Sequence, residues 1–192
     1  MTPPVVIPVL LFEGGALDDA VRQELVALLP RLRRFAYGLS GSTDEGDDLV
    51  QSACERALAR LHQWQAGTRL DSWMFRIVQT VWVDRLRAGR RRETTTDVAD
   101  LDRIPGGDAA REIEGRLMLS AVRHHVAALP EEQRNVLLLV SVEGASYKEA
   151  AKILDVPIGT VMSRLARARL ALGRALGQVG AEAPRVAART GS

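Results

Sequence analysis

The predicted outward side of one helix near the C-terminus carries the residues best suited to binding nucleic acid. At 100° per residue, Thr160, Ser163, Ala166 and Arg167 point away from the apolar side of the helix, with Met162 and Arg164 on the flanks. The planar guanidinium of arginine can bind guanine O6 and N7 bidentately, and it also neutralises phosphates. A small, polar and arginine-rich helix face of this kind fits the major groove of DNA.

A shorter helix is predicted directly before this one. Ser146 and Glu149 form a capping box at its start, and Pro157 ends it. Apolar residues at i, i+4, i+7 and i+11 then give the longer helix a buried side: Val161, Leu165, Ala168 and Leu172. The pattern predicts a helix-turn-helix. The alternative is an ordinary pair of packed helices with solvated arginines.

An upstream segment, residues 17–92, is predicted to form a helical domain of its own. Three apolar stripes at helical spacing run through it. Thr43 and Asp44 are predicted to start the second helix. The third helix runs into five arginines within eight residues: Arg85, Arg87, Arg90, Arg91 and Arg92. Such a run of cations suits a nucleic-acid backbone.

The stretch between these segments has a different composition. Residues 93–108 hold five carboxylates, one arginine, three threonines and a Pro-Gly-Gly turn, which predicts a flexible acidic linker. The expected fold is all-α, with two small helical domains of which the second is a helix-turn-helix. The predicted divisions are a flexible tail at 1–16, a first domain at 17–92, a linker at 93–112, a second domain at 113–177 and a flexible tail at 178–192.

Composition narrows the possible functions. The net charge is only +2, although 24 of the 26 basic residues are arginine, so clustering rather than total charge indicates nucleic acid. The single cysteine, Cys54, forbids an internal disulfide and is expected to be buried. No segment approaches the roughly 20 apolar residues of a membrane span, so we expect no membrane insertion and a cytoplasmic protein. Without a glycine-rich phosphate loop, an HExxH motif or a Cys–His pairing, we expect no catalytic residues, no cofactor and no metal.

The segment LPEEQRNVLLLVSVEGASYKEAAKILDVPIGTVMSRLARAR, residues 129–169, closely resembles the promoter-reading C-terminal domain of bacterial sigma factors of the extracytoplasmic-function (ECF) type. The first domain resembles the same family. The motifs that carry the likeness are PIGTV at 157–161, SRL at 163–165 and RAR at 167–169, and in the first domain DDLVQ at 47–51, WMFRIV at 73–78 and DRLR at 84–87.

This resemblance implies a factor that binds core RNA polymerase, directs it to specific promoters and helps open the minus-ten element. The implied contacts with the β′ clamp helices are Asp47, Asp48, Leu49, Gln51 and Glu55. The implied minus-ten contacts are Thr80, Asp84, Arg85, Arg87, Arg90 and Arg91. The six outward residues of the second domain would read the minus-thirty-five element, and that domain would meet the β flap. An anti-sigma factor and a stress or envelope response are also implied.

Two departures from the family pattern bear on promoter sequence rather than on the class of function. Many members have asparagine at the position of Thr80, and many carry a larger or charged residue at Met162 and Ala166. The rival interpretation is a stand-alone helix-turn-helix regulator that binds an operator. That class needs only the second domain and leaves the pattern of residues 47–92 unexplained.

Overall fold

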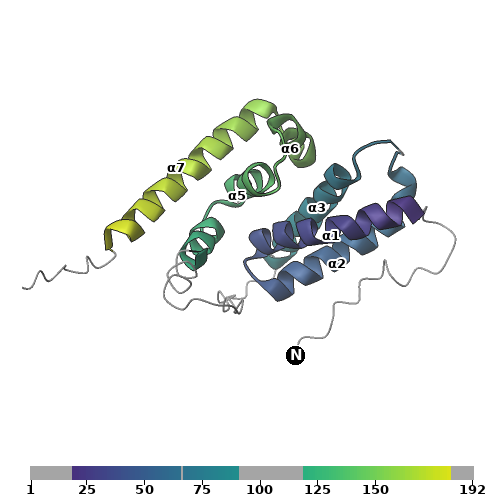
Figure 1. Ribbon diagram of the computed structural model, residues 1–192, viewed down its shortest axis with the longest axis horizontal. Coiled ribbons are helices and arrows are strands. Elements are labelled where there is room, and N and C mark those ends of the chain that lie inside the picture. Colours follow the sequence, from purple (N-terminus) through teal and green to yellow (C-terminus); the bar gives the residue numbers. More distant parts are fainter. Residues whose placement is uncertain (1–18, 66, 91–118, 183–192) are drawn as a thin grey trace, which may run out of the picture.

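The computed structural model describes residues 19–65, 67–90 and 119–182, and the regular elements in these ranges are all helical, as predicted. In chain order they are α1 (Asp19–Ser40), α2 (Thr43–Ala59), the short 3-10 helix η2 (Leu61–Gln63), α3 (Leu70–Arg90), a helical stretch at 119–127, α5 (Glu131–Leu137), the π-helical turn η3 (Leu138–Val142), α6 (Tyr147–Leu154) and α7 (Ile158–Glu182) (Figure 1). The predicted tail at 1–16 and linker at 93–112 lie outside the described residues.

The first three long helices form one bundle with an apolar centre. Each has an apolar stripe at helical spacing, and the stripes meet in a core that includes Phe35 and Phe75. The rings of these two residues pack edge to face, with centroids 5.3 Å apart and planes at 87°. Ser42 caps α2 by accepting a hydrogen bond from the amide of Glu45, one residue before the predicted start at Thr43. Trp82 of α3 is also buried in this core.

The second bundle is built from α5, η3, α6 and α7. Pro130 precedes α5, which begins at Glu131. The π-helical turn at the end of α5 has no counterpart in the sequence prediction. α7 continues to Glu182, beyond the domain boundary predicted at residue 177.

The two bundles pack against each other. α6 lies beside α3, and α1 meets α5 and η3 (Figure 1). Their buried side chains belong to one contiguous cluster. At the contact, a Cβ placed on Gly38 of α1 would come within 2.6 and 2.8 Å of the two methyl carbons of Leu138, so a larger residue here would require the Leu138 side chain or the helices to shift. The sequence predicted two domains but not this interface.

Candidate nucleic-acid interface

The helix-turn-helix pair forms at the predicted residues. The Oγ of Ser146 accepts a hydrogen bond from the amide of Glu149 at 3.2 Å, and the Glu149 carboxylate accepts one from the amide of Ser146 at 2.8 Å. These two bonds are the predicted capping box. α6 ends at Asp155 in the left-handed region (φ 54°), which aspartate tolerates better than most residues. Pro157 immediately precedes α7, so the turn between the helices is short.

The outward face of α7 is largely open to solvent. Its predicted inward residues Val161 and Leu165 are buried. Four of the six predicted minus-thirty-five residues are exposed: Met162, Ser163, Ala166 and Arg167. Thr160 is half-buried, and its carbonyl accepts a hydrogen bond from the Oγ of Ser163 at 3.0 Å. The face is therefore available to a groove without any rearrangement of α7 itself.

Arg164 differs from the other predicted contacts on α7. Its Nη2 lies 2.5 Å from the Oε2 of Glu132 on α5, and only 20% of its side chain is exposed. The carboxylate holds the guanidinium at the flank of the helix rather than at the centre of the outward face. Arg167 is exposed, and it is therefore the better placed arginine for reading a base edge.

The predicted minus-ten residues on α3 fall into two groups. Thr80, Asp84 and Arg87 are exposed. The Oγ1 of Thr80 donates to the carbonyl of Arg76 at 2.8 Å, and Asp84 pairs with Arg56 of α2 at 2.8 Å. Polar side chains therefore line this side of α3, although Asp84 and Thr80 already have partners within the bundle.

Arg85 turns toward α2. Its Nη2 donates to the carbonyl of Asp48 at 2.9 Å and to the Oγ of Ser52 at 2.8 Å. These bonds link α3 to α2, so the Arg85 side chain stabilises the packing of the two helices. The side chain of Arg90 and the whole of Arg91 lie outside the described residues.

The predicted polymerase-binding residues on α2 do not all share one surface. Asp48 and Glu55 are exposed, and the Nε2 of Gln51 donates to the Oε1 of Glu55 at 3.2 Å, so these three form a polar face. Asp47 is half-buried beside it. Leu49 is fully buried in the core, and we therefore correct its assignment from polymerase contact to packing residue.

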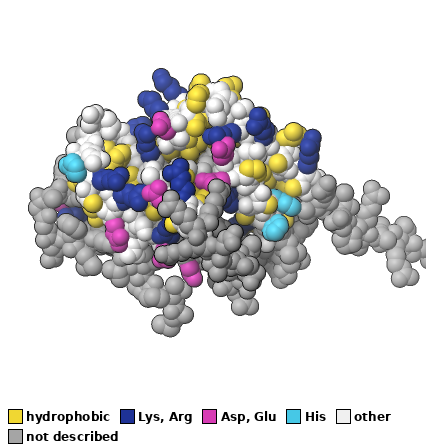
Figure 2. All heavy atoms as spheres, turned by 180° about the vertical axis from the view of Figure 1, so that it is seen from behind, with side chains coloured by type: hydrophobic (Ala, Val, Ile, Leu, Met, Phe, Trp, Pro, Cys, Tyr) yellow, Lys and Arg dark blue, Asp and Glu magenta, His cyan; other side chains and the backbone are white. Residues whose placement is uncertain are grey.

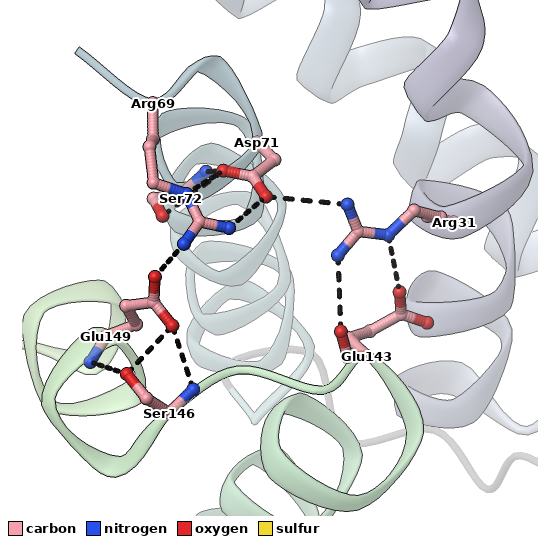
Figure 3. Close-up of polar contacts among 7 residues, drawn as sticks. All are labelled: Arg31, Arg69, Asp71, Ser72, Glu143, Ser146 and Glu149. Atoms are coloured by element: carbon pink, nitrogen blue, oxygen red, sulfur yellow. Dashed lines mark hydrogen bonds and ion pairs between the residues drawn. The ribbon is translucent and has the colours of Figure 1, made fainter.

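An ion-pair network joins the two bundles (Figure 3). The carboxylate of Glu143, at the end of η3, is completely buried and pairs with Arg31 at 3.2 Å and with Arg34 at 2.9 Å, both on α1. Arg31 also donates to the backbone carbonyl of Glu143 at 3.2 Å. Farther along α3, Arg76 lies 3.7 Å from Asp155 at the end of α6. Sequence reasoning missed this network because its partners lie about a hundred residues apart.

The same network continues through Asp71 on α3. Arg69 binds both Asp71, at 2.6 Å, and Glu149 of α6, so it bridges the bundles as well (Figure 3). Burial alone would raise the pKa of Asp71. Hydrogen bonds from Arg69, from the amide of Ser72 and from Arg31 outweigh it and hold the pKa of Asp71 below its ordinary value. Asp71 is therefore ionised wherever the protein is folded near neutral pH.

Residues predicted for two different promoter elements line one cleft between the bundles. The cleft has a volume of about 330 Å³. Gln79 and Arg87 of α3 form one wall, and Glu132, Asn135 and Arg164 form part of the other. In this arrangement the predicted minus-ten and minus-thirty-five surfaces are neighbours.

Basic side chains on the rear face of the molecule are interspersed with acidic ones rather than gathered in one patch (Figure 2). This agrees with the low net charge. A second, shallow groove beside the helix-turn-helix is lined by Lys148 and Lys152, the only two lysines of the chain. Sequence reasoning did not assign them a role, although their i, i+4 spacing on α6 could have drawn attention to them.

Other predicted features of the chain can be placed as well. Cys54 is buried, and burial raises the pKa of its thiol to about 11. Among the described residues, no group of histidine, cysteine and carboxylate side chains is arranged to hold a metal ion. No helix in the described ranges is long and apolar enough to cross a membrane.

Two family models match the two bundles. The one described as "Sigma-70, region 4" matches residues 119–172, and the one described as "Sigma2 domain of PhyR" matches residues 25–79. The chain is 38% identical over 169 residues to the ECF RNA polymerase sigma factor EcfG of Rhodopseudomonas palustris, a match that covers 86% of this chain and 90% of that protein. It is 34% identical over 154 residues to the ECF sigma factor SigE of Mycolicibacterium smegmatis, covering 79% and 58%.

Solved structures agree with the sequence matches. The sigma factor RpoE of Bartonella quintana, in complex with the anti-sigma factor NepR, has a TM-score of 0.70 and 30% identity over 83% of this chain and 98% of that one. The chain therefore belongs to the ECF sigma factors of the sigma-70 family. It is a transcription initiation factor that directs RNA polymerase to promoters, and not an enzyme.

Proposed function

We propose that this chain divides promoter recognition between its two bundles. α7 reads the minus-thirty-five element with Thr160, Met162, Ser163, Ala166 and Arg167, and Arg164 contacts the backbone at its flank. The single observation that carries this assignment is the open outward face of α7 on a capped helix-turn-helix. Lys148 and Lys152 of α6 lie where the first helix of such a pair crosses the phosphate backbone.

The first bundle then has two tasks. Thr80, Asp84 and Arg87 on α3, together with Arg85, Arg90 and Arg91, engage the opened minus-ten strand, where cations follow the phosphates. Asp47, Asp48, Gln51 and Glu55 on α2 bind the β′ clamp helices of core polymerase, and the second bundle meets the β flap. The polar face joined by Gln51 and Glu55 supports the α2 assignment, because the side chains of Asp48 and Glu55 are exposed on it.

The packed arrangement of the bundles has to open during initiation. The two promoter elements are centred about 25 base pairs apart, or roughly 85 Å at 3.4 Å per base pair. Arg87 and Arg164 line the same cleft, so the surfaces that carry them cannot reach both elements while the bundles touch. Separation breaks the pairs between Glu143 and the arginines of α1.

The packed form also suggests how the protein is held inactive in the cytoplasm. The solved relative RpoE is bound to an anti-sigma factor and matches this arrangement over most of both chains. We infer that an anti-sigma partner binds the packed form of this chain, and that its release under stress frees the bundles to separate.

The test is run-off transcription with purified core polymerase on a library of promoter fragments. The expected result is promoter-dependent transcripts only when the protein is added. Arg167→Ala should remove discrimination at the minus-thirty-five element, at a cost of about 1–3 kcal/mol for a bidentate base contact. Tight binding of DNA by the protein alone, without any promoter-dependent transcript, would favour a stand-alone regulator.

A further inference from the structure

The outward side of α7 carries two exposed apolar side chains beside its polar and charged ones. Met162 is 52% exposed, and Ala166, one turn further on, is exposed beside it. Met162 lies at the flank of the outward face and Ala166 nearer its centre, and packing within the described residues buries neither side chain. On a helix face proposed to bind DNA, these exposed apolar atoms can contact apolar groups of the ligand.

Gly159, at the start of the same face, also lacks an explanation within the chain. Glycine weakens a helix relative to alanine. A Cβ added at Gly159 would meet nothing within 4 Å, and its φ is not positive. Neither the packing of the described residues nor the backbone conformation calls for glycine here. A remaining reason is close approach of an external molecule to the helix backbone.

The positive charge around this face favours nucleic acid as the molecule that approaches α7. α7 holds four arginines and no carboxylate before its last residue, Glu182. A protein partner that covered Met162 would have to accommodate these cations, whereas DNA supplies a phosphate for each. In the major groove, the apolar group on a base edge is the 5-methyl of thymine, and apolar side chains contact it.

We infer that Met162 and Ala166 read the 5-methyl groups of thymines in the minus-thirty-five element, and that Gly159 lets α7 approach the duplex closely enough for them to do so. Ser163 and Arg167 lie between and beside these contacts and supply the hydrogen bonds. The inference rests on the proposed placement of α7 in the minus-thirty-five groove. The 5-methyl group of thymine is the chemical feature that this face would recognise in that groove.

The experiment uses the full chain bound to core polymerase. A preferred minus-thirty-five duplex is first selected from a randomised pool. Each thymine in it is then replaced singly by deoxyuridine, which removes the methyl group and keeps every hydrogen-bonding atom. At one or two positions the wild type should bind the deoxyuridine duplex about fourfold more weakly, the factor that burial of one methyl group supplies.

Variants of the protein then show which side chain contacts each thymine methyl group. Met162→Ala should bind the thymine and deoxyuridine duplexes equally at its position, and Ala166→Gly should do so at the other. Arg167→Ala is the matched control: it should weaken binding of both duplexes and leave their ratio unchanged. Gly159→Ala should raise the urea midpoint of unfolding yet weaken duplex binding, a combination that a purely structural glycine would not give.

Two results would overturn the inference, and they have different consequences for the proposed function. A selected duplex on which no thymine-to-deoxyuridine change alters affinity would leave the proposed function standing and remove methyl readout. Met162 would then belong to a protein interface. Failure to select any sequence would overturn the proposed function of α7 together with the inference.

Discussion

The guanidinium of Arg34 donates two hydrogen bonds to the carboxylate of Glu143, from Nε to Oε1 at 2.9 Å and from Nη2 to Oε2 at 3.1 Å. This bidentate pair joins α1 of the first bundle to the end of η3 in the second. The Glu143 side chain is fully buried, whereas that of Arg34 is 52% exposed. The charge of the buried carboxylate is therefore stabilised by the arginines, whereas the partly exposed arginines can also be hydrated by water.

This asymmetry predicts that Glu143→Ala separates the bundles without unfolding either one. Arg31 and Arg34 would face an apolar gap and turn to solvent, which should cost about 1–3 kcal/mol of interface stability. Small-angle scattering should show a larger radius of gyration, with unchanged helical circular dichroism. Asp47→Asn is the control: it breaks the surface pair of Asp47 with Arg33, at 2.8 Å, and should leave the radius of gyration unchanged.

Gly38→Ala tests the same interface by steric means. The new methyl group would lie within 2.8 Å of both terminal carbons of Leu138, which is itself buried, so we expect the tight packing around Leu138 to push the bundles apart. Overpacking of this kind costs about 1–3 kcal/mol. The same scattering measurement should show expansion even though every charge is retained. A radius of gyration equal to that of the wild type would mean that Leu138 finds another rotamer at little cost.

The polar face of α2 gives a prediction about polymerase. Asp48→Ala combined with Gln51→Ala should reduce affinity for core polymerase sharply, because the face loses one of its two carboxylates and its amide. The fold should persist, since neither side chain belongs to the apolar core. Affinity is measured by titrating labelled core polymerase, with circular dichroism as the folding control. Glu24→Ala, an exposed change on α1, is the matched variant. Equal affinity of the folded double variant and the wild type would remove this face from the mechanism.

Asp71 gives the interface a pH dependence. Its folded pKa lies below the ordinary value of 3.8, so its ionised form stabilises the folded state fully above that value. This contribution is lost as pH falls through the lower folded pKa. Urea unfolding should give the wild type a larger free energy of unfolding than Asp71→Asn at about pH 6. The difference between the two should shrink as the pH is lowered to about 2. A difference that stays constant with pH would assign the effect to packing alone.

Cys54 should be unreactive in the folded protein. Its thiol is buried, and its pKa of about 11 leaves almost no thiolate at pH 8. A chromogenic disulfide reagent should therefore label it only after denaturant is added. Oxidant should change neither stability nor partner binding in the wild type or in Cys54→Ser, although the buried hydroxyl of the variant should lower its baseline stability. Rapid labelling under native conditions would contradict this account.

The sequence by itself determined the helices, the capping box and the outward face of α7. These features depend on interactions between residues one to four positions apart, which the order of side chains fixes directly. Ser146 and Glu149 cap α6 in this way, and Val161 and Leu165 assign the buried side of α7 by spacing alone. The family motifs added the two functional surfaces, whose individual contacts remain predictions.

The tertiary structure decided which members of each surface are available. Leu49 and Asp48 are neighbours in sequence, yet one is in the core and the other is exposed. Arg164 is held by Glu132, on another helix, and Arg167 is open to solvent. The contact of Glu143 with Arg31 spans 112 residues. Such pairings depend on how whole helices pack, and a periodicity of a few residues carries no information about them.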